Sequence, residues 1–289
     1  MSEAFFRRSF VVLALFALSG GAAFAAPSAR IHISNNWAGY AATGDTYSGV
    51  SATWTVPTST GTDQVISADA AWVGIGGISD NDLIQAGTQA VILNGRTQYV
   101  AWYELLPGTQ QVAPIDVHPG DLVSVSVNEV SKGYWSIVIN NQTTQRMYQN
   151  VVAYHSSRSS AEWIVERPLA VAGNAMGYLP LSNFGSTLFK QATLRTTHGQ
   201  VLNAADSGAQ ALIMGGEQSR LLAAPGDTTG DSFMVSYLSD SESRQYMQDL
   251  RRDYTLQRQE NVASREANYQ QINTSFIIHV IFSGLSKHY

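Results

Sequence analysis

The stretch VSVSVNEVSKGYWSIVI, residues 123–139, alternates apolar and polar residues in two runs on either side of a Lys-Gly pair. Valines separated by serines make up the first run, and Trp135, Ile137 and Ile139 take alternate positions in the second. Successive side chains of a β-strand point to opposite faces, so a period of two predicts strands with one apolar face. The Lys-Gly pair is typical of the turn between such strands. We therefore predict two neighbouring strands, each of which buries one face.

The same pattern recurs along most of the chain. Residues 50–56, VSATWTV, place their apolar side chains on one strand face and a serine and two threonines on the other. Turn-forming pairs separate such runs, among them Pro107-Gly108, Pro119-Gly120 and Asn140-Asn141. No alternation of strands and helices is visible. The sequence therefore predicts an all-β fold, a sandwich of two antiparallel β-sheets of the concanavalin-like or jelly-roll type.

The N-terminus reads as an export signal. Arg7-Arg8 is followed by a mostly apolar run, residues 9–18, and then by Ala23-Phe24-Ala25. These are the n-region, h-region and cleavage site of a signal peptide, in order. The apolar run is too short to cross a membrane, which takes about 20 residues. We expect export to the medium or the periplasm, with no membrane anchor after removal of the signal.

Four segments are predicted: a signal peptide at 1–25, a short linker at 26–35, a β-sandwich domain at 36–239 and an extension at 240–289. The extension is rich in Arg, Gln, Glu and Asp, and its apolar residues recur at helical spacing, which predicts an amphipathic helix. Those residues are Tyr246, Met247, Leu250 and Tyr254. One hypothesis is that the extension covers a cleft or an edge of the sandwich until it is cleaved, and the alternative is an accessory or disordered extension.

Composition excludes several classes of function. The chain has 289 residues, of which 13% are charged, and a formal net charge of −5, so it lacks the basic stripe of a nucleic-acid-binding protein. It has no cysteine, which excludes disulfides, a thiolate nucleophile and cysteine-based metal sites. Its six histidines show no metal-ligand spacing. We expect no metal and no cofactor.

Other functions find weaker support. Gly230-Asp231-Ser232 is followed by phenylalanine where a serine-peptidase nucleophile loop needs glycine. Asp206-Ser207-Gly208 matches the aspartic-peptidase motif, but the chain has no second copy to share the proton. Glu104 and Glu162 could serve a glycosidase as acid and base, which would leave Gln85 dispensable. A secreted β-sandwich that binds glycans or proteins without catalysis is the alternative from another class.

Strand parity, the alternation of side chains between the two faces of a strand, places polar side chains opposite core residues. Glu162, for example, shares a face with Glu166, opposite Trp163. A single glutamate or glutamine on a strand is most often a solvated residue, so parity alone does not assign a site. The three sets that share a face are Leu83, Gln85, Gly87 and Gln89; Val100, Trp102 and Glu104; and Glu162, Ile164 and Glu166.

Six segments, in their order along the chain, resemble the glutamic peptidase (eqolisin) family over about residues 35 to 238. They are Asn36–Tyr40, Ala52–Pro57, Trp72–Gly77, Leu83–Gly87, Tyr99–Glu104 and Ala161–Pro168. The resemblance implies a two-sheet sandwich and a catalytic pair, Gln85 in its L-Q-x-G context and Glu162 at the start of E-W-I-V-E. It also implies a place beside this pair, at the substrate, for Trp72, Trp102, Glu104 and Gln89.

The activity implied by the resemblance is acid endopeptidase cleavage of proteins or peptides, without cofactor, by a chain expected to be a monomer. Glu162 as carboxylate would take a proton from a water that attacks the peptide carbonyl. Gln85 would hold the water and donate to the developing oxyanion. The chain departs from the family where acidic residues are common: it has Gly76, Gln89 and Val100 at those positions.

Overall fold

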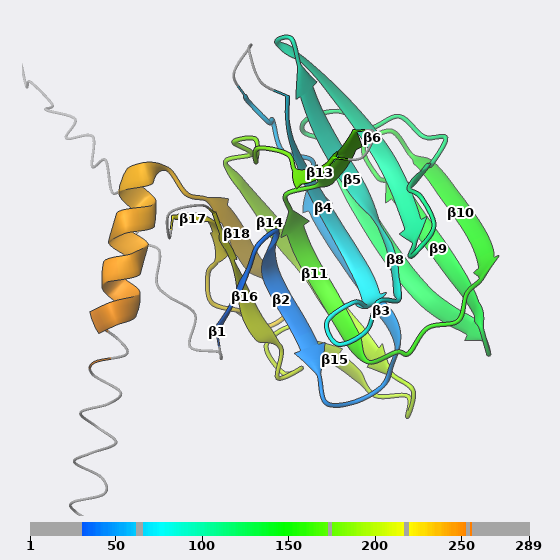
Figure 1. The fold of residues 1–289 in the computed structure, drawn as a ribbon. Helices are drawn as coiled ribbons and strands as arrows, with labels where there is room; N and C mark the ends of the chain where they lie inside the picture. Colours follow the sequence, from blue (N-terminus) through cyan, green and yellow to red (C-terminus); the bar gives the residue numbers. More distant parts are fainter. Residues whose placement is uncertain (1–30, 62–65, 173–174, 217–219, 253–254, 256–289) are drawn as a thin grey trace, which may run out of the picture.

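The computed structural model describes residues 31–61, 66–172, 175–216, 220–252 and 255. In these ranges the chain forms two mostly antiparallel β-sheets packed face to face, followed by one helix (Figure 1). The predicted all-β sandwich is confirmed. The predicted signal peptide at 1–25 and the extension after residue 255 lie outside the described residues.

The larger sheet holds most of the strands: β1 (Ile31–Ser34), β2 (Trp37–Thr43), β4 (Ser67–Gly76), β5 (Leu83–Leu93), β6 (Arg96–Leu105), β7 (Gln111–Val112), β11 (Ser160–Glu166), β14 (Ser186–Thr196), β16 (Gln210–Gly215), β17 (Leu221–Pro225) and β18 (Phe233–Tyr237). Their order is β14-β18-β17-β16-β2-β11-β4-β5-β6-β7, and β1 pairs in parallel with β16. β1 falls within 26–35, the segment predicted as a linker.

The smaller sheet runs in the order β10-β9-β8-β3, continues into β14, and has β15 paired to β14. The alternating stretch 123–139 forms β8 and β9 of this sheet, joined by the predicted Lys-Gly turn, in which Gly133 has a φ of 76°. The new strands are β3 (Tyr47–Thr55), β8 (Leu122–Ser131), β9 (Tyr134–Asn141), β10 (Arg146–Ala153) and β15 (Val201–Asn203).

Two connections complete the framework. Strand β14 belongs to both sheets, because Ser186–Phe189 pairs with β18 and Lys190–Thr196 pairs with β3, with register shifts between Lys190 and Thr193 and between Arg195 and Thr196. A separate hairpin of β12 (Leu169–Ala172) and β13 (Ala175–Tyr178) follows β11.

The main core lies between the two sheets and is rich in aromatic residues. Trp54, Trp163 and Phe189 are almost fully buried there. Burying an aromatic or large aliphatic side chain stabilises a fold by roughly 2–3 kcal/mol. Two indole N–H groups also bond across the core: Trp54 donates to Thr88 at 3.0 Å, and Trp163 donates to the carbonyl of Ser51 at 2.9 Å. Because Trp163 faces this core, alternate residues of β11 face the opposite, outer side of the larger sheet.

The helix at 240–252 confirms the first part of the helical pattern predicted for the extension, and Tyr254 lies outside the described residues. Ser239 and Glu242 form a capping box, in which the Ser239 backbone N–H donates to Glu242 Oε2 at 2.8 Å. Tyr246, 2% exposed, packs against a separate apolar cluster at the edge of the sandwich beside β17 (Figure 1). That cluster consists of Ile213, Leu221, Ala224, Leu238 and Tyr246. Among the described residues, no helix has the length and apolar character that a membrane crossing needs.

Candidate active site

Four residues from four neighbouring strands form a line across the outer face of the larger sheet. Glu162 of β11 pairs with Gly74 of β4, Gly74 pairs with Gln85 of β5, and Gln85 pairs with Glu104 of β6. Directly opposed residues of a sheet point to the same face, so the three polar side chains rise from one surface. We call Glu162, Gly74, Gln85 and Glu104 the dyad row.

Glu162 is completely buried, and neither of its carboxyl oxygens has a hydrogen-bond partner among the described residues. Burial raises the pKa of Glu162 well above its ordinary value, and the negative charge of Asp82 adds to this shift. The Ser160 hydroxyl, on the same face of β11, acts in the opposite direction. A buried carboxyl holds its proton more tightly than a solvated one, which is a property of acid–base residues in active sites.

Gln85 is oriented by Glu104. Its Nε2 donates to Glu104 Oε2 at 2.8 Å, while its Oε1 has no partner among the described residues. Burial raises the pKa of Glu104, although the hydrogen bond from Gln85 opposes that shift. The bond leaves the second N–H of the amide and the carbonyl oxygen of Gln85 available for another molecule.

A second line of paired residues, next to the dyad row, is formed by Ile164, Trp72, Gly87 and Trp102. Gly87 separates the two indoles, and a Cβ on it would collide with the backbone of Ala71 and with Trp72. Trp72 is fully buried and Trp102 is 3% exposed, so both rings form the floor beneath this face. The Trp102 Nε1 has no partner among the described residues.

Glu166 ends the E-W-I-V-E motif, and the sequence did not predict it as a site residue. Its two oxygens accept hydrogen bonds from Asn36 Nδ2 at 2.9 Å and Trp72 Nε1 at 2.8 Å. Burial raises its pKa to about 7, against the effect of these donors. The sequence signal was its spacing, since Glu166 lies four residues from Glu162 on the same strand face. Glu166 fixes the indole of Trp72 beneath the site.

The remaining predicted residues lie at the border of the site. Gln89 pairs with Val100 in the line beyond the tryptophans, and its Oε1 accepts a hydrogen bond from Gln110 at 2.9 Å. Gly76 ends β4 and has a φ of 94°. The structure thus brings Gln85, Glu104 and Glu162 together in one row, Trp72 and Trp102 in the next, and Gln89 one line further away.

A cavity of about 400 Å³ lies beside this face. The rings of Trp37 and Trp72 form a T-shaped pair with 5.0 Å between ring centroids, and Trp37 also lines the cavity. The lining is Ile33, Ser34, Asn35, Asn36, Trp37, Gly77, Ile78, Tyr178 and Leu212.

The other motifs weighed in the sequence form turns. Asp206 accepts a hydrogen bond from Asn203 Nδ2 at 2.8 Å in a turn, and Ser232 pairs with Thr229 in an isolated bridge. Within the described ranges, no three His, Cys, Asp or Glu side chains gather as a metal site would require.

The comparisons with known proteins agree with this geometry. The sequence profile of the Peptidase A4 family matches residues 35–237. The chain belongs to this family. It is therefore a glutamic peptidase, a hydrolase of peptide bonds, and the resemblance noted in the sequence is confirmed.

Two curated relatives of this glutamic peptidase are aspergillopepsin-2 of Aspergillus niger and scytalidopepsin B of Scytalidium lignicola. The first is 28% identical over 229 residues, which are 71% of this chain and 78% of that protein. The second is 26% identical over 210 residues, 70% of this chain and 79% of that protein.

The fold agrees with solved structures as well. Scytalido-glutamic peptidase with a peptide-based transition-state analogue superposes on this glutamic peptidase with a TM-score of 0.63 at 25% identity, covering 71% of this chain and 98% of that one. Aspergilloglutamic peptidase from Aspergillus niger gives a TM-score of 0.52 at 28% identity, covering 60% and 99%.

Proposed function

We propose that this chain is a secreted, acid-acting endopeptidase in which Glu162 and Gln85 form the catalytic dyad. The observation that carries the proposal is the dyad row. Glu162 and Gln85 point to the same face with only a glycine between them, and both have buried oxygens without a partner among the described residues. Buried polar atoms are normally hydrogen-bonded, so such a pair suits a water molecule and a substrate carbonyl.

The proposed reaction begins with a water held between the two side chains. Glu162 in its carboxylate form removes a proton from this water, whose oxygen then attacks the peptide carbonyl. The free N–H of Gln85 donates to the oxygen that becomes negatively charged. Glu162 then passes its proton to the leaving nitrogen while the oxyanion re-forms a carbonyl and the peptide bond breaks, so the negative charge returns to Glu162.

Protonation sets the pH range of this reaction. Because the pKa of Glu162 is raised, its base form appears at a higher pH than that of an ordinary glutamate, and the catalytic rate should fall on the acid side of this titration. A water that donates a hydrogen bond to Glu162 favours the charged form and brings this pKa back down. Gln85 stays neutral throughout, so its role does not change with pH.

The substrate is proposed to be an unfolded protein or peptide. The related protein SCP-B has been solved in a complex with the tripeptide Ala-Ile-His, which indicates a peptide ligand for this chain as well. The cavity beside Trp37 would accept a substrate side chain, to which Leu212 and Ile78 offer apolar contacts among the more polar lining residues. Replacing Leu212 with Arg should therefore lower kcat/KM for peptides with a Leu or Phe at the matching position more than for peptides with Ala there.

Secretion is part of the proposal and rests on the sequence of residues 1–25. Expression of the full chain, followed by N-terminal sequencing of the exported protein, tests it. A mature N-terminus that follows Ala25 supports export. Retention of the whole chain inside the cell contradicts it.

The dyad is tested by cleavage of a denatured protein from about pH 2 to about pH 8, with Glu162→Gln and Gln85→Ala beside the wild type. Matched controls are Glu242→Gln in the helix cap and Gln98→Ala on the exposed part of β6. We expect both dyad variants to lose at least about a hundredfold in kcat, and both controls to keep activity. Cleavage that survives in Gln85→Ala would contradict the dyad and favour a pair of carboxylates.

A further inference from the structure

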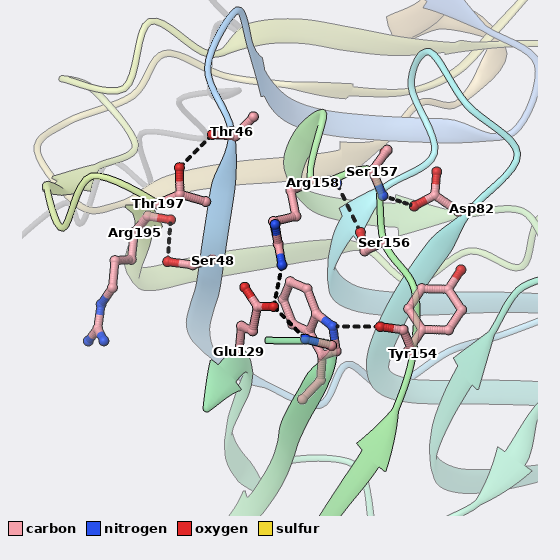
Figure 2. Close-up of polar contacts among 12 residues, drawn as sticks. Thr46, Ser48, Asp82, Glu129, Tyr154, Ser156, Ser157, Arg158, Arg195 and Thr197 are labelled. Atoms are coloured by element: carbon pink, nitrogen blue, oxygen red, sulfur yellow. Dashed lines mark hydrogen bonds and ion pairs between the residues drawn. The ribbon is translucent and has the colours of Figure 1, made fainter. Parts of the chain in front are cut away.

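Asp82 lies in the loop between β4 and β5, next to the segment that leads into Glu162. Its Oδ2 accepts a hydrogen bond from the backbone N–H of Ser157 at 2.5 Å, and Figure 2 shows the carboxylate pointing at that nitrogen. Ser157 belongs to the crossover segment, residues 154–159, which connects β10 of the smaller sheet to β11 of the larger one. Glu162 follows this segment by only three residues, so whatever fixes the segment also fixes the start of β11.

The crossover segment is attached at several further points. The Tyr154 hydroxyl accepts from the Leu83 N–H at 2.8 Å and donates to the Leu106 carbonyl at 2.7 Å. The Arg158 guanidinium pairs with Glu129 of β8, a contact that Figure 2 draws. A segment held from both sheets has few alternative positions, so the start of β11 is defined by contacts on either side of it.

The Asp82 carboxylate also occupies the space at the end of β4, on the face that carries the dyad row. A Cβ on Gly76 would lie 3.3 Å from Asp82 Oδ2 and only 2.5 Å from the backbone oxygen of the same residue. No side chain at position 76 fits there without a shift of the loop. Since Ala161 pairs with Ile75, Ser160 is the neighbouring residue of β11 at this end. The Asp82 carboxylate therefore places a negative charge at this end of β4, where the strand itself has no charged residue.

We propose that Asp82 is a positioning residue for peptide cleavage: its hydrogen bond from Ser157 fixes the start of β11, and its carboxylate places a negative charge beside the segment that leads into Glu162. This rests on the proposed function, in which Glu162 is the general base. A base with a higher pKa accepts a proton from water more readily once it is ionised. Asp82 would therefore make Glu162 a stronger base. As a consequence, activity would begin at a higher pH.

Among the charged groups near Glu162, Asp82 is expected to have the largest effect on the pKa of Glu162. Burial is the largest cause of the raised pKa of Glu162, and the charge of Asp82 is the one that adds to it. The strands beside Glu162 place Ala41, Gly74 and Gln85 in its row, and none of these titrates. The elements around it carry further titratable groups: Tyr40 of β2, Tyr47 of β3, Asp69 of β4, Glu104 of β6, Glu166 of β11, Tyr154 and His155 of the crossover segment, and Arg158, whose charge is paired with Glu129.

The test compares Asp82→Asn with the matched control Asp80→Asn, which removes a charge from an exposed position of the same loop. Asparagine keeps an oxygen that can accept from Ser157, so the variant removes the charge and retains the contact. We expect the acid limb of the kcat/KM profile to move down by about half a pH unit or more in Asp82→Asn, which is about threefold more activity at a pH below the limb. The limb of Asp80→Asn should coincide with that of the wild type.

A carbon-13 NMR titration of the Glu162 carboxyl measures the same shift without substrate, so it also serves a variant that no longer cleaves. If Asp82→Asn does not fold, Asp82→Ser, which keeps a hydroxyl acceptor, is titrated in its place. Coincident limbs and coincident Glu162 titrations for the wild type and the Asp82 variant would overturn the inference and leave the dyad intact. A wild type that does not cleave, or cleavage that does not need Glu162, would overturn the proposed function instead.

Discussion

Glu162 of β11 and Gln85 of β5 lie in one line across the larger sheet, with only Gly74 of β4 between them. Strands in a sheet are about 4.8 Å apart, so two long side chains separated by one strand can hold a single water between their ends. Any side chain on the middle strand would stand in this space. The site therefore requires a glycine at position 74 as well as the two polar side chains of Glu162 and Gln85.

Gly74→Ala is predicted to damage both activity and stability. The added methyl would lie 2.9 Å from Leu83 Cδ1 and from Trp72 Cζ3, and 3.2 Å from the carbonyl oxygen of Ile84. Such overpacking costs about 1–3 kcal/mol, and displacement of Trp72 would disturb the floor beside the dyad. We expect kcat/KM to fall at least about tenfold in protein that is still folded by circular dichroism. Gly177→Ala is the control, since a Cβ there meets nothing within 4 Å. Full activity in Gly74→Ala would show that catalysis does not need the space that Gly74 leaves between Glu162 and Gln85.

Glu104→Gln is predicted to lower kcat with little change in KM. The Glu104 carboxylate fixes the amide of Gln85 through the 2.8 Å bond, and a charged acceptor is stronger than a neutral one. A glutamine at this position could also turn its own N–H₂ toward Gln85, which would let that amide rotate. We expect kcat to fall about tenfold in steady-state assays with a peptide substrate. A KM effect alone would mean that Glu104 contacts the substrate without orienting Gln85.

The local patterns of the chain were sufficient to predict strands and their faces. Alternation in 123–139 predicted β8 and β9, and parity along E-W-I-V-E separated Trp163 in the core from Glu162 on the outer face. These features depend on neighbours in the chain, whose side-chain directions are fixed by the pleat.

Features that depend on residues far apart in the sequence could not be predicted from it. That Gly74 stands between Glu162 and Gln85 depends on the register of three strands, and the hydrogen bond from Asn36 to Glu166 joins residues 130 positions apart. Asp82 could not be placed because its position depends on a loop and on a crossover from the other sheet. Pairing register and loop position are set by tertiary packing, which leaves no periodic signal in the sequence.

The fold is predicted to be more stable in mild acid than at neutral pH, in part because of Asp69. This residue of β4 is 3% exposed and accepts a hydrogen bond from the Ser182 hydroxyl. Burial raises its pKa to about 6. A folded-state pKa above the unfolded value of about 3.9 means that this group stabilises the fold fully below about pH 4, and that the effect is lost as the pH rises through about 6. The shift of about two units corresponds to about 3 kcal/mol.

Asp69→Asn should remove this part of the pH dependence, because asparagine resembles the protonated acid. Urea unfolding at about pH 4 and about pH 7, in a Gln85→Ala background that prevents self-cleavage, measures the difference. We expect the variant to unfold at a higher urea concentration than its parent at neutral pH. Asp116→Asn, at an exposed position, serves as the control. Parallel pH dependence in all three proteins would rule out Asp69 as a source of acid stability.

Tyr246→Ala is predicted to destabilise the protein without changing its catalytic constants. The ring is 2% exposed in the cluster beside β17, which is separate from the apolar floor under the dyad row. Removing a buried aromatic side chain costs about 3–5 kcal/mol. Tyr246→Phe is the matched control: the Tyr246 hydroxyl has no partner among the described residues, so its loss should be nearly neutral. Thermal unfolding gives the stability, and kcat/KM is measured well below the Tm of the weaker variant. If kcat/KM changes in folded Tyr246→Ala, the helix is coupled to the active site, and the hypothesis that the extension covers the cleft gains support.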